Sequence, residues 1–259
     1  MQKKPHILIT NDDGIDALGL KHLWQALSDD FRISIVAPSS EKSGAGLGIT
    51  IRDPLHIQQV PWEKETSAWK VSGTPADCVR MGISVLLENP PDLIVSGINR
   101  GSNAGRNVLY SGTVGGVIEG VLRNVPGIAF SCDDYVKPDY VAAEKQVVPI
   151  VRYLLSHPLP RGTLLNVNVP TCPKVLGVKL ASQGRGYWIE NPDERVHPSE
   201  GRRYYWLGGK WEHHPEENHS DVALLKEGYV TCVPIHVHEL TDREVISSHK
   251  DRFEKMMNT

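Results

Sequence analysis

The sequence lacks the features that mark membrane-bound, exported and zinc-binding proteins. No apolar run among its 259 residues approaches the length of a membrane span. The apolar stretch after the MQKKP start is too short for a signal peptide, so we expect a cytoplasmic protein with no membrane partner. The 4 cysteines lie far apart and form no CxxC pair, which argues against a zinc site and favours free thiols at Cys78, Cys132, Cys172 and Cys232.

The charge distribution also excludes one class of partner. The chain has 28 basic and 31 acidic residues, a formal net charge of -3, and neither a basic stripe nor an acidic tail. We therefore expect no nucleic acid polymer as partner, and a small anionic substrate would need local groups to hold it. No internal repeat or low-complexity tract is visible. The length permits one large α/β domain, or a domain with an appendage, with a substantial buried core.

The most informative stretch is ILITNDDGIDALG, residues 7 to 19. Its apolar start predicts a parallel strand buried on both faces, and the helical spacing that begins at Leu20 predicts a helix after it. Asp12 and Asp13 lie between them, at the carboxyl end of the strand, where open α/β sheets bind ligands. Two like charges this close repel unless a cation lies between them. An ordinary polar turn with an aspartate N-cap explains the same residues, so both readings stay open.

Another loop, residues 39 to 48, follows a strand predicted at 32 to 37. By the same rule about strand ends, it should lie near the acidic turn. Ser43 and Gly44 offer a hydroxyl oxygen and free backbone N–H groups. Serine and glycine are common turn residues, so a purely structural loop is the alternative.

A third loop, residues 97 to 110, follows a strand predicted at 92 to 96 and is rich in glycine and asparagine. It is neither a Walker A loop nor a GxGxxG fingerprint, yet such a loop can gather donors around a phosphate. Ser111, Gly112 and Thr113 then precede a helix, whose free N–H groups and positive dipole end form an anion site. A glycine-rich connection with an ordinary cap is the alternative, although a 14-residue loop without regular structure is uncommon unless it is functional.

The order of the elements predicts an α/β fold with a doubly wound, mostly parallel, Rossmann-like sheet over residues 1 to 182. We expect a short antiparallel excursion at 49 to 72 and a helix at 73 to 87 that Thr74 caps, with Asp77 in a structural role. The remaining strands and helix are expected at 127 to 131, 140 to 156, 164 to 169 and 177 to 180.

From residue 183 to 259 the character changes to a β-rich extension, which we expect to form an oligomer contact because aromatic residues concentrate there. His213, His214 and His219 match no strong metal-ligand spacing, so a solvated polar loop is the favoured interpretation. His236 and His238 alternate on one strand face, where we expect surface or interface residues.

Together these segments resemble the SurE (survival protein E) family of metal-dependent nucleotidases. The resemblance runs in family order along nearly the whole chain, and its motifs are specific as a set: ILITNDDG at 7 to 14, Ser43 with Gly44, GTPADCV at 73 to 79, SGIN at 96 to 99 with Gly101 and Asn103, YSGTV at 110 to 114, and SDVALLKEGYV at 220 to 230. The chain departs from the commoner family form at Ser39 and Ser40, where an Asp-Arg pair is usual, which puts substrate contacts in that loop in doubt.

The resemblance implies a Rossmann-like core, a C-terminal arm exchanged between subunits of a homodimer or homotetramer, and hydrolysis of nucleoside monophosphates. The expected activity is that of a 5'-nucleotidase, with 3'-nucleotides and short polyphosphates left open as further substrates. By motif match the metal ligands fall on Asp12, Asp13, Ser43 and Asn99. These are hard oxygen donors from three loops, and they suit one Mg²⁺ or Mn²⁺ per subunit.

The hypothesis for mechanism is attack by a metal-activated water that Asp12 or Asp13 orients or deprotonates. Groups for the phosphate and substrate are expected at Asn11, Gly44, Gly101, Asn103, Ser111, Gly112 and Thr113. A phosphatase with a covalent aspartate is one rival, although adjacent acids fit it less well than acids one residue apart. A non-catalytic, metal-dependent nucleotide-binding regulatory module is the other.

Overall fold

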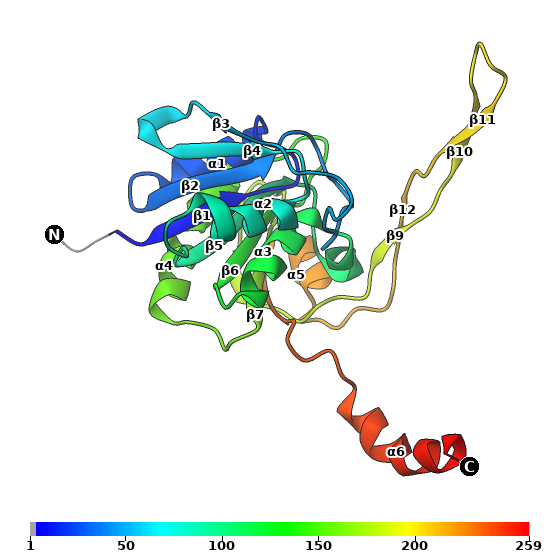
Figure 1. Ribbon diagram of the computed structural model, residues 1–259. Helices are drawn as coiled ribbons and strands as arrows, with labels where there is room; N and C mark the ends of the chain where they lie inside the picture. The colour runs from blue at the N-terminus through cyan, green and yellow to red at the C-terminus, as the bar shows by residue number, and fades with distance from the viewer. Residues whose placement is uncertain (1–3, 259) are drawn as a thin grey trace.

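The chain forms one large sheet covered by helices, and a computed structural model describes residues 4–258 (Figure 1). The sheet has 9 strands in the order β3-β4-β2-β1-β5-β6-β7-β13-β8. In chain order these strands are β1 (His6–Thr10), β2 (Arg32–Pro38), β3 (Ile57–Val60), β4 (Ser67–Val71), β5 (Leu93–Arg100), β6 (Gly127–Cys132), β7 (Thr163–Val169), β8 (Gly177–Leu180) and β13 (Tyr229–His236).

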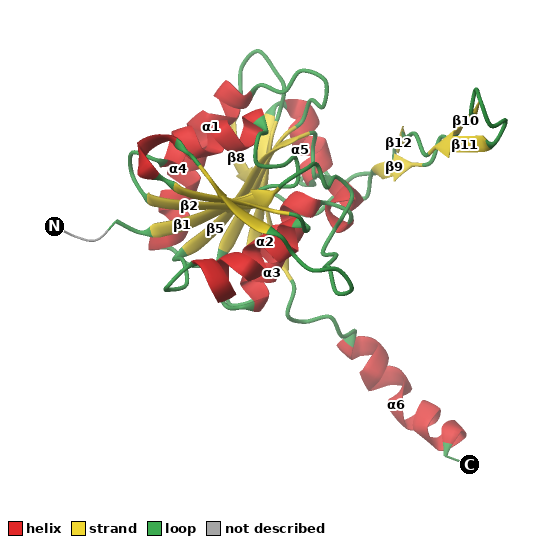
Figure 2. Ribbon diagram, turned by 45° about the horizontal axis from the view of Figure 1, so that its top comes forward, coloured by secondary structure: helices red, strands yellow, loops and turns green. Residues whose placement is uncertain are grey.

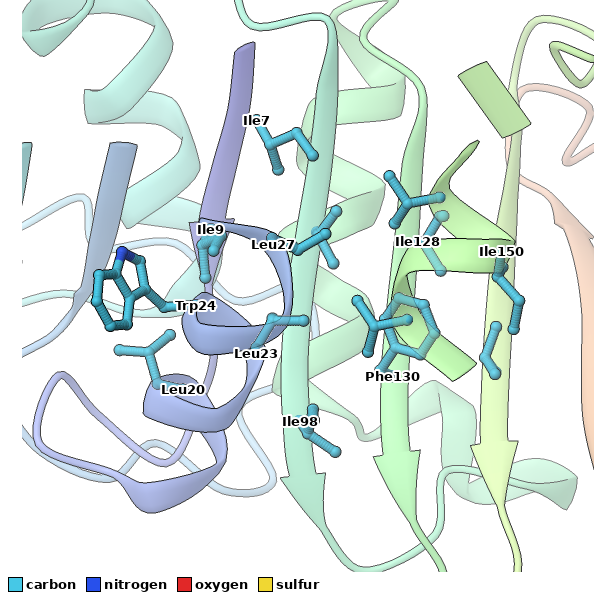
Figure 3. Close-up of a cluster of buried hydrophobic side chains, with 14 of the residues drawn as sticks. Ile7, Ile9, Leu20, Leu23, Trp24, Leu27, Ile98, Ile128, Phe130 and Ile150 are labelled. Atoms are coloured by element: carbon cyan, nitrogen blue, oxygen red, sulfur yellow. The ribbon is translucent and has the colours of Figure 1, made fainter. Parts of the chain in front are cut away.

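Helices cover both faces of this sheet (Figure 2). One buried cluster unites the sheet with α1 (Leu18–Leu27) and α4 (Tyr140–Ser156), around Trp24 and Phe130 (Figure 3). A second cluster on the other face unites it with α2 (Pro75–Met81) and α3 (Gly112–Leu122). The central strands are apolar without alternation because side chains on both faces are buried. The predicted α/β fold with a mostly parallel sheet is confirmed.

The chain reverses its direction of winding next to β1. From β1 it proceeds to β2 and then to β4 on one side, and it returns to pair β5 with the other side of β1. The strands β1, β2, β5 and β6 are parallel, so their carboxyl ends lie at one edge of the sheet. A crevice forms at such a switch point, and the acidic turn after β1 borders it.

Several elements differ from those expected. The excursion at 49 to 72 does contain an antiparallel pair, β3 with β4, but β4 also extends the main sheet in parallel to β2. The loop at 97 to 110 is partly regular, because β5 continues to Arg100 and a 3-10 helix, η3, spans Gly105–Leu109. Within the stretch 183 to 259, β13 pairs with β7 and β8, so this part of the extension lies inside the main sheet.

Two segments project from the body in both views (Figures 1 and 2). One is an arm in which β9 (Tyr187–Ile189) pairs with β12 (Lys210–Glu212) and β10 (Asp193–Val196) pairs with β11 (Arg203–Trp206). The other is α6 (Arg243–Met257), which has no buried residue. Between them in sequence, α5 (Asp221–Glu227) packs on β13. Over residues 4–258, every helix is too short or too polar to span a membrane.

Candidate functional site

The turn after β1 is closed by its own asparagine. Asn11 accepts a hydrogen bond from the backbone N–H of Gly14 at 3.2 Å, and its side-chain amide donates to the Gly14 carbonyl at 2.9 Å. Asn11 and Asp12 are buried, whereas Asp13 is partly exposed. The sequence led us to expect a substrate contact at Asn11. In the structure, its side chain shapes the turn that presents the two acids.

Asp12 faces the first turn of α3. The hydroxyl of Thr113 donates to its carboxylate, and a Cβ added to Gly112 would lie 2.8 Å from the Asp12 Cβ, so only glycine permits this approach. Burial raises the pKa of Asp12, while the Thr113 hydroxyl and the backbone N–H groups of Thr113 and Gly112 oppose that rise. The helix N-terminus that the sequence indicated as an anion site therefore points at one of the two predicted acids.

Asp13 lies against the end of β5, because the backbone N–H of Arg100 donates to its carboxylate at 3.4 Å. Burial, and then the neighbouring charge of Asp12, raise the pKa of Asp13 to about 6, although Arg100 opposes the shift. Two carboxylates held this close in a partly dry crevice favour a bound cation, as the sequence suggested. Arg100 was not predicted as part of the site; its place between Asn99 and Gly101 was the only signal for it.

Asn99 is the penultimate residue of β5, beyond a register shift between Ser96 and Asn99 in the pairing of β5 with β6. Its amide nitrogen donates to the carbonyl of Gly101 at 2.8 Å, which leaves the amide oxygen directed away from that bond and able to bind a cation. Asn99 directly precedes Arg100, whose backbone N–H donates to the Asp13 carboxylate.

Ser43 lies in a loop that is bonded to the acidic turn. The backbone N–H of Lys42 donates to the Asp12 carbonyl at 2.7 Å, and the charge of Glu41 contributes to the raised pKa of Asp13. The Ser43 hydroxyl itself donates to Glu41 at 2.8 Å. Gly44 follows it with φ +76 and is exposed. The loop thus reaches the acids, while the Ser43 hydroxyl bonds to a carboxylate of its own loop.

The residues expected around the phosphate divide into two groups. Ser111 caps α3 by accepting from the N–H of Val114 at 3.1 Å, and Gly112 begins that helix. The side chains of Asn103 and Thr113 are engaged within the protein instead, with Ser131 at 2.7 Å and with Asp12 respectively. The hydroxyl hydrogen of Ser111 can still donate to an anion, whereas the N–H of Gly112 already bonds to Asp12 and the second group braces the surrounding loops.

The donors present suit a hard divalent ion. Within residues 4–258 no group of three or more histidine, cysteine, aspartate and glutamate residues could hold a metal, so a site here needs oxygen from hydroxyl, amide or water. Asp12, Asp13, Ser43 and Asn99 supply that mixture, which Mg²⁺ and Mn²⁺ accept with waters completing the shell. Burial raises the pKa of both acids despite the hydrogen bonds that they accept, so a cation bound between them would stabilise their charged forms.

Three histidines of the extension contact aromatic rings or a carboxylate. His214 stacks on Tyr187 at 5.2 Å between ring centroids, His213 lies edge-on to Trp211, and His219 pairs with Glu217 at 2.9 Å. Within residues 4–258, these histidines belong to no group of three or more side chains that could hold a metal ion. His236 and His238 are exposed at the end of β13 and just beyond it, as predicted for surface residues.

Comparison with known proteins places the chain among relatives of one kind. The model of the family described as survival protein SurE matches residues 7–190. The protein named 5'-nucleotidase SurE from Protochlamydia amoebophila is 48% identical over 261 residues, which cover 100% of both chains. Its namesake from Thermosipho africanus is 40% identical over 251 residues, covering 96% of this chain and 98% of that protein. A crystal structure of the SurE protein from Aquifex aeolicus superposes with a TM-score of 0.81 at 35% identity, covering 95% and 98% of the two chains.

Proposed function

Because the chain belongs to the survival protein SurE family, we propose that it is a 5'-nucleotidase, an enzyme that hydrolyses nucleoside monophosphates to nucleoside and phosphate. The single observation that carries this beyond family membership is the placement of Asp12 and Asp13. Two acids with raised pKa values lie at the switch point of a parallel sheet, Asp12 against the N-terminus of α3 and Asp13 against the end of β5. The alternative of a non-catalytic nucleotide-binding module is not favoured, since the relatives are named as nucleotidases.

We place one Mg²⁺ or Mn²⁺ per subunit between Asp12, Asp13, Ser43 and Asn99. The hydroxyl of Ser43 donates to Glu41 in the structure, and it would exchange this bond for the ion when it acts as a ligand. When bound, the ion supplies positive charge that polarises the phosphate and favours ionisation of the attacking water. Removal of the ion is therefore expected to abolish turnover.

The chain's own side chains and backbone N–H groups have distinct roles in the reaction. Asp13 is partly exposed and is the acid that orients the attacking water and accepts its proton, while buried Asp12 stays fixed by Thr113. The Ser111 hydroxyl hydrogen and the N–H groups at Gly101 and Gly44 donate to the phosphate oxygens, while the N–H of Gly112 holds Asp12. Asn11, Asn103 and Thr113 hold these donors in place through the bonds described above.

The test is phosphate release from purified protein. A panel of nucleoside 5'- and 3'-monophosphates and short polyphosphates is assayed with Mg²⁺, with Mn²⁺ and with EDTA. We expect metal-dependent release from 5'-monophosphates, and a loss of about a thousandfold or more in Asp13→Asn with an unchanged circular dichroism spectrum. Full activity in Asp13→Asn, or activity that EDTA leaves intact, contradicts the mechanism, and a trapped phosphoaspartate favours the covalent rival.

We also propose that the projecting segments of 183 to 259 are oligomerisation arms of a homodimer or homotetramer. Large side chains stand exposed along the first arm, among them Trp188 at 57%, Trp206 at 66% and Leu207 at 69%. Apolar side chains of α6, such as Phe253 at 63%, are exposed as well. Several large apolar side chains exposed on projecting segments favour burial against another subunit. The cytoplasm is the proposed place of action, because the 4 cysteines are free.

A further inference from the structure

The carboxylate of Asp221 is completely buried at the start of α5 and accepts hydrogen bonds from three separate places in the fold. Its own helix contributes the N–H of Val222 at 2.8 Å. The root of the arm contributes the N–H of Gly184 at 2.8 Å and the side-chain amide of Gln183 at 2.9 Å. The third place is Gly105, whose N–H lies 3.1 and 3.2 Å from the two carboxylate oxygens.

Capping of α5 does not account for this arrangement. Ser220 is the N-cap of α5, and its hydroxyl already accepts from the N–H of Ala223 at 3.2 Å. The bond from Gly105 spans 116 residues of sequence and does nothing for α5. Asp221 therefore serves the segment that contains Gly105.

That segment is η3, which leads directly to the proposed phosphate donors. Gly105 has φ +61, and a Cβ there would lie 2.2 Å from the carbonyl oxygen of Gly186, so the backbones are in direct contact. At the other end of η3, the N–H of Ser111 bonds to the Val108 carbonyl at 3.4 Å. The next residue, Gly112, begins α3 against Asp12. A displacement at Gly105 is thus transmitted along one short helix to Ser111 and Gly112.

We propose that Asp221 is a positioning residue for the hydrolytic reaction, which anchors η3 so that Ser111 stands at the correct place for the phosphate and Gly112 at the correct place against Asp12. This inference rests on the proposed function, since it concerns the same phosphate site. A carboxylate suits the role because its two oxygens accept several N–H bonds at once, whereas asparagine offers a single acceptor oxygen. Displacement of transition-state donors by a fraction of an ångström lowers turnover strongly.

The electrostatic setting agrees with this role. Burial raises the pKa of Asp221 to about 6, the N–H groups of Gly184, Gly105 and Val222 oppose the rise, and the charge of Glu216 adds to it. The carboxyl is thus ionised at neutral pH. No salt bridge compensates it among residues 4–258, so the N–H donors alone stabilise its charge.

The main experiment compares Asp221→Asn with two matched variants. Glu216→Gln makes the same change of carboxylate to amide at the arm root, where Glu216 accepts from the N–H groups of Arg185 and Gly186 at 2.9 and 2.8 Å. Ser220→Ala removes the α5 cap and leaves the Asp221 carboxylate in place. We expect kcat for nucleotides and for a small aryl phosphate to fall by the same factor, about tenfold or more, in Asp221→Asn, with KM changed about twofold at most. Both control variants should stay within about twofold of the wild-type kcat.

Hydrogen exchange tests the same inference without any substrate. In Asp221→Asn, amides of residues 101–111 should exchange faster than in wild type and in both control variants. If the wild-type protein has no nucleotidase activity, the proposed function is refuted. Hydrogen exchange of residues 101–111 still decides in that case whether Asp221 anchors η3. Unchanged exchange or unchanged kcat in folded Asp221→Asn overturns the inference, and so does an equal loss of kcat in Glu216→Gln.

A second variant covers the case in which Asp221→Asn does not fold. Gln183→Met keeps the carboxylate but removes the side-chain amide that bonds both to Asp221 and to the Gly105 carbonyl. We expect the same direction of change in kcat and in exchange of residues 101–111, with a smaller amplitude. Wild-type values of both quantities in Gln183→Met overturn the inference.

Discussion

We propose that the two acids of the turn after β1 are placed for binding rather than for stability. Asp12 is buried, which raises its pKa, while bonds from Thr113 and the start of α3 oppose that rise. Burial, and then the charge of the neighbouring Asp12, raise the pKa of Asp13 to about 6. Groups that a folded protein holds against their electrostatic preference are typical of functional sites.

Removal of one of these charges is expected to stabilise the metal-free chain. Asp13→Asn relieves the repulsion from Asp12 and should raise the free energy of unfolding by about 1 kcal/mol, or roughly 2–4 °C in melting temperature. Added Mg²⁺ or Mn²⁺ should raise the melting temperature of the wild type but not of the variant. Thermal denaturation with EDTA and with metal measures both effects. Asp16→Asn, an exposed acid of the same turn, is the control, and a less stable Asp13→Asn in EDTA contradicts the account.

The cysteines should differ in reactivity according to burial. Burial raises the pKa of Cys132 and Cys232 to about 12 and that of Cys78 well above its usual range, whereas Cys172 is only partly buried. With an aromatic disulfide reagent, we expect one thiol of the native chain to react rapidly, and all 4 thiols to react after denaturation. Cys172→Ser should remove the rapid phase. A rapid phase that survives in Cys172→Ser would show that a core thiol is accessible.

At the scale of elements, Asp77 connects a helix to the loop that carries Ser43. It completes a capping box with Thr74 at the start of α2, as its sequence position predicted. Its carboxylate also accepts from the backbone N–H and hydroxyl of Thr50, at 3.1 and 2.7 Å. Burial alone would raise the pKa of Asp77, but these hydrogen bonds from Thr50 and Thr74 outweigh it and lower the pKa below 3.8.

This lowered pKa predicts how the stability difference between the wild type and Asp77→Asn depends on pH. The group contributes stability above its unfolded value of 3.8, and the contribution is lost as pH falls through the lower folded value. The variant should be less stable than wild type by about 1 kcal/mol at neutral pH, and the difference should shrink in strong acid. Urea denaturation across pH measures this difference. Asp53→Asn, at an exposed position, should show no such trend, and a difference that grows towards acid refutes the assignment.

The sequence predicted local elements well and distant pairings poorly. Strand β1, helix α4 and the Ser111 cap follow from apolar runs, helical spacing and capping chemistry, which are local signals. Alternation at His236 indicated a strand, but the extent of β13 and its place between β7 and β8 were not predicted, because that place depends on pairing with residues some 65 positions away, such as Cys232 with Val167. Periodicity carries no information about such pairing.

The site was predictable to a similar extent. The acids and the N-terminus of α3 were indicated by strand ends and capping residues, and the structure brings Asp12 and Thr113 together. The contact of Arg100 with Asp13 depends on the backbone, for which the residue type gives no signal. The bond of Asp221 to Gly105 joins positions 116 residues apart, and only the family resemblance of residues 220 to 230 marked that segment.

At the scale of the whole molecule, a compact body contains the site, and two segments project from it (Figures 1 and 2). Replacement of the arm tip, residues 190–209, by a short turn should reduce the proposed oligomer to a smaller species, because exposed Trp206 and Leu207 are removed. Light scattering after gel filtration measures the mass, and circular dichroism checks that the body folds. An unchanged mass shows that this arm is not the contact.

The central claim is that Asp12, Asp13, Ser43 and Asn99 jointly hold one divalent ion. Anomalous X-ray scattering from crystals of the protein soaked in Mn²⁺ tests it most directly. We predict one strong peak per subunit within about 2.5 Å of oxygen atoms from all four residues. A Mn²⁺ peak at any other position, or no peak between these residues at saturating Mn²⁺, would contradict the account.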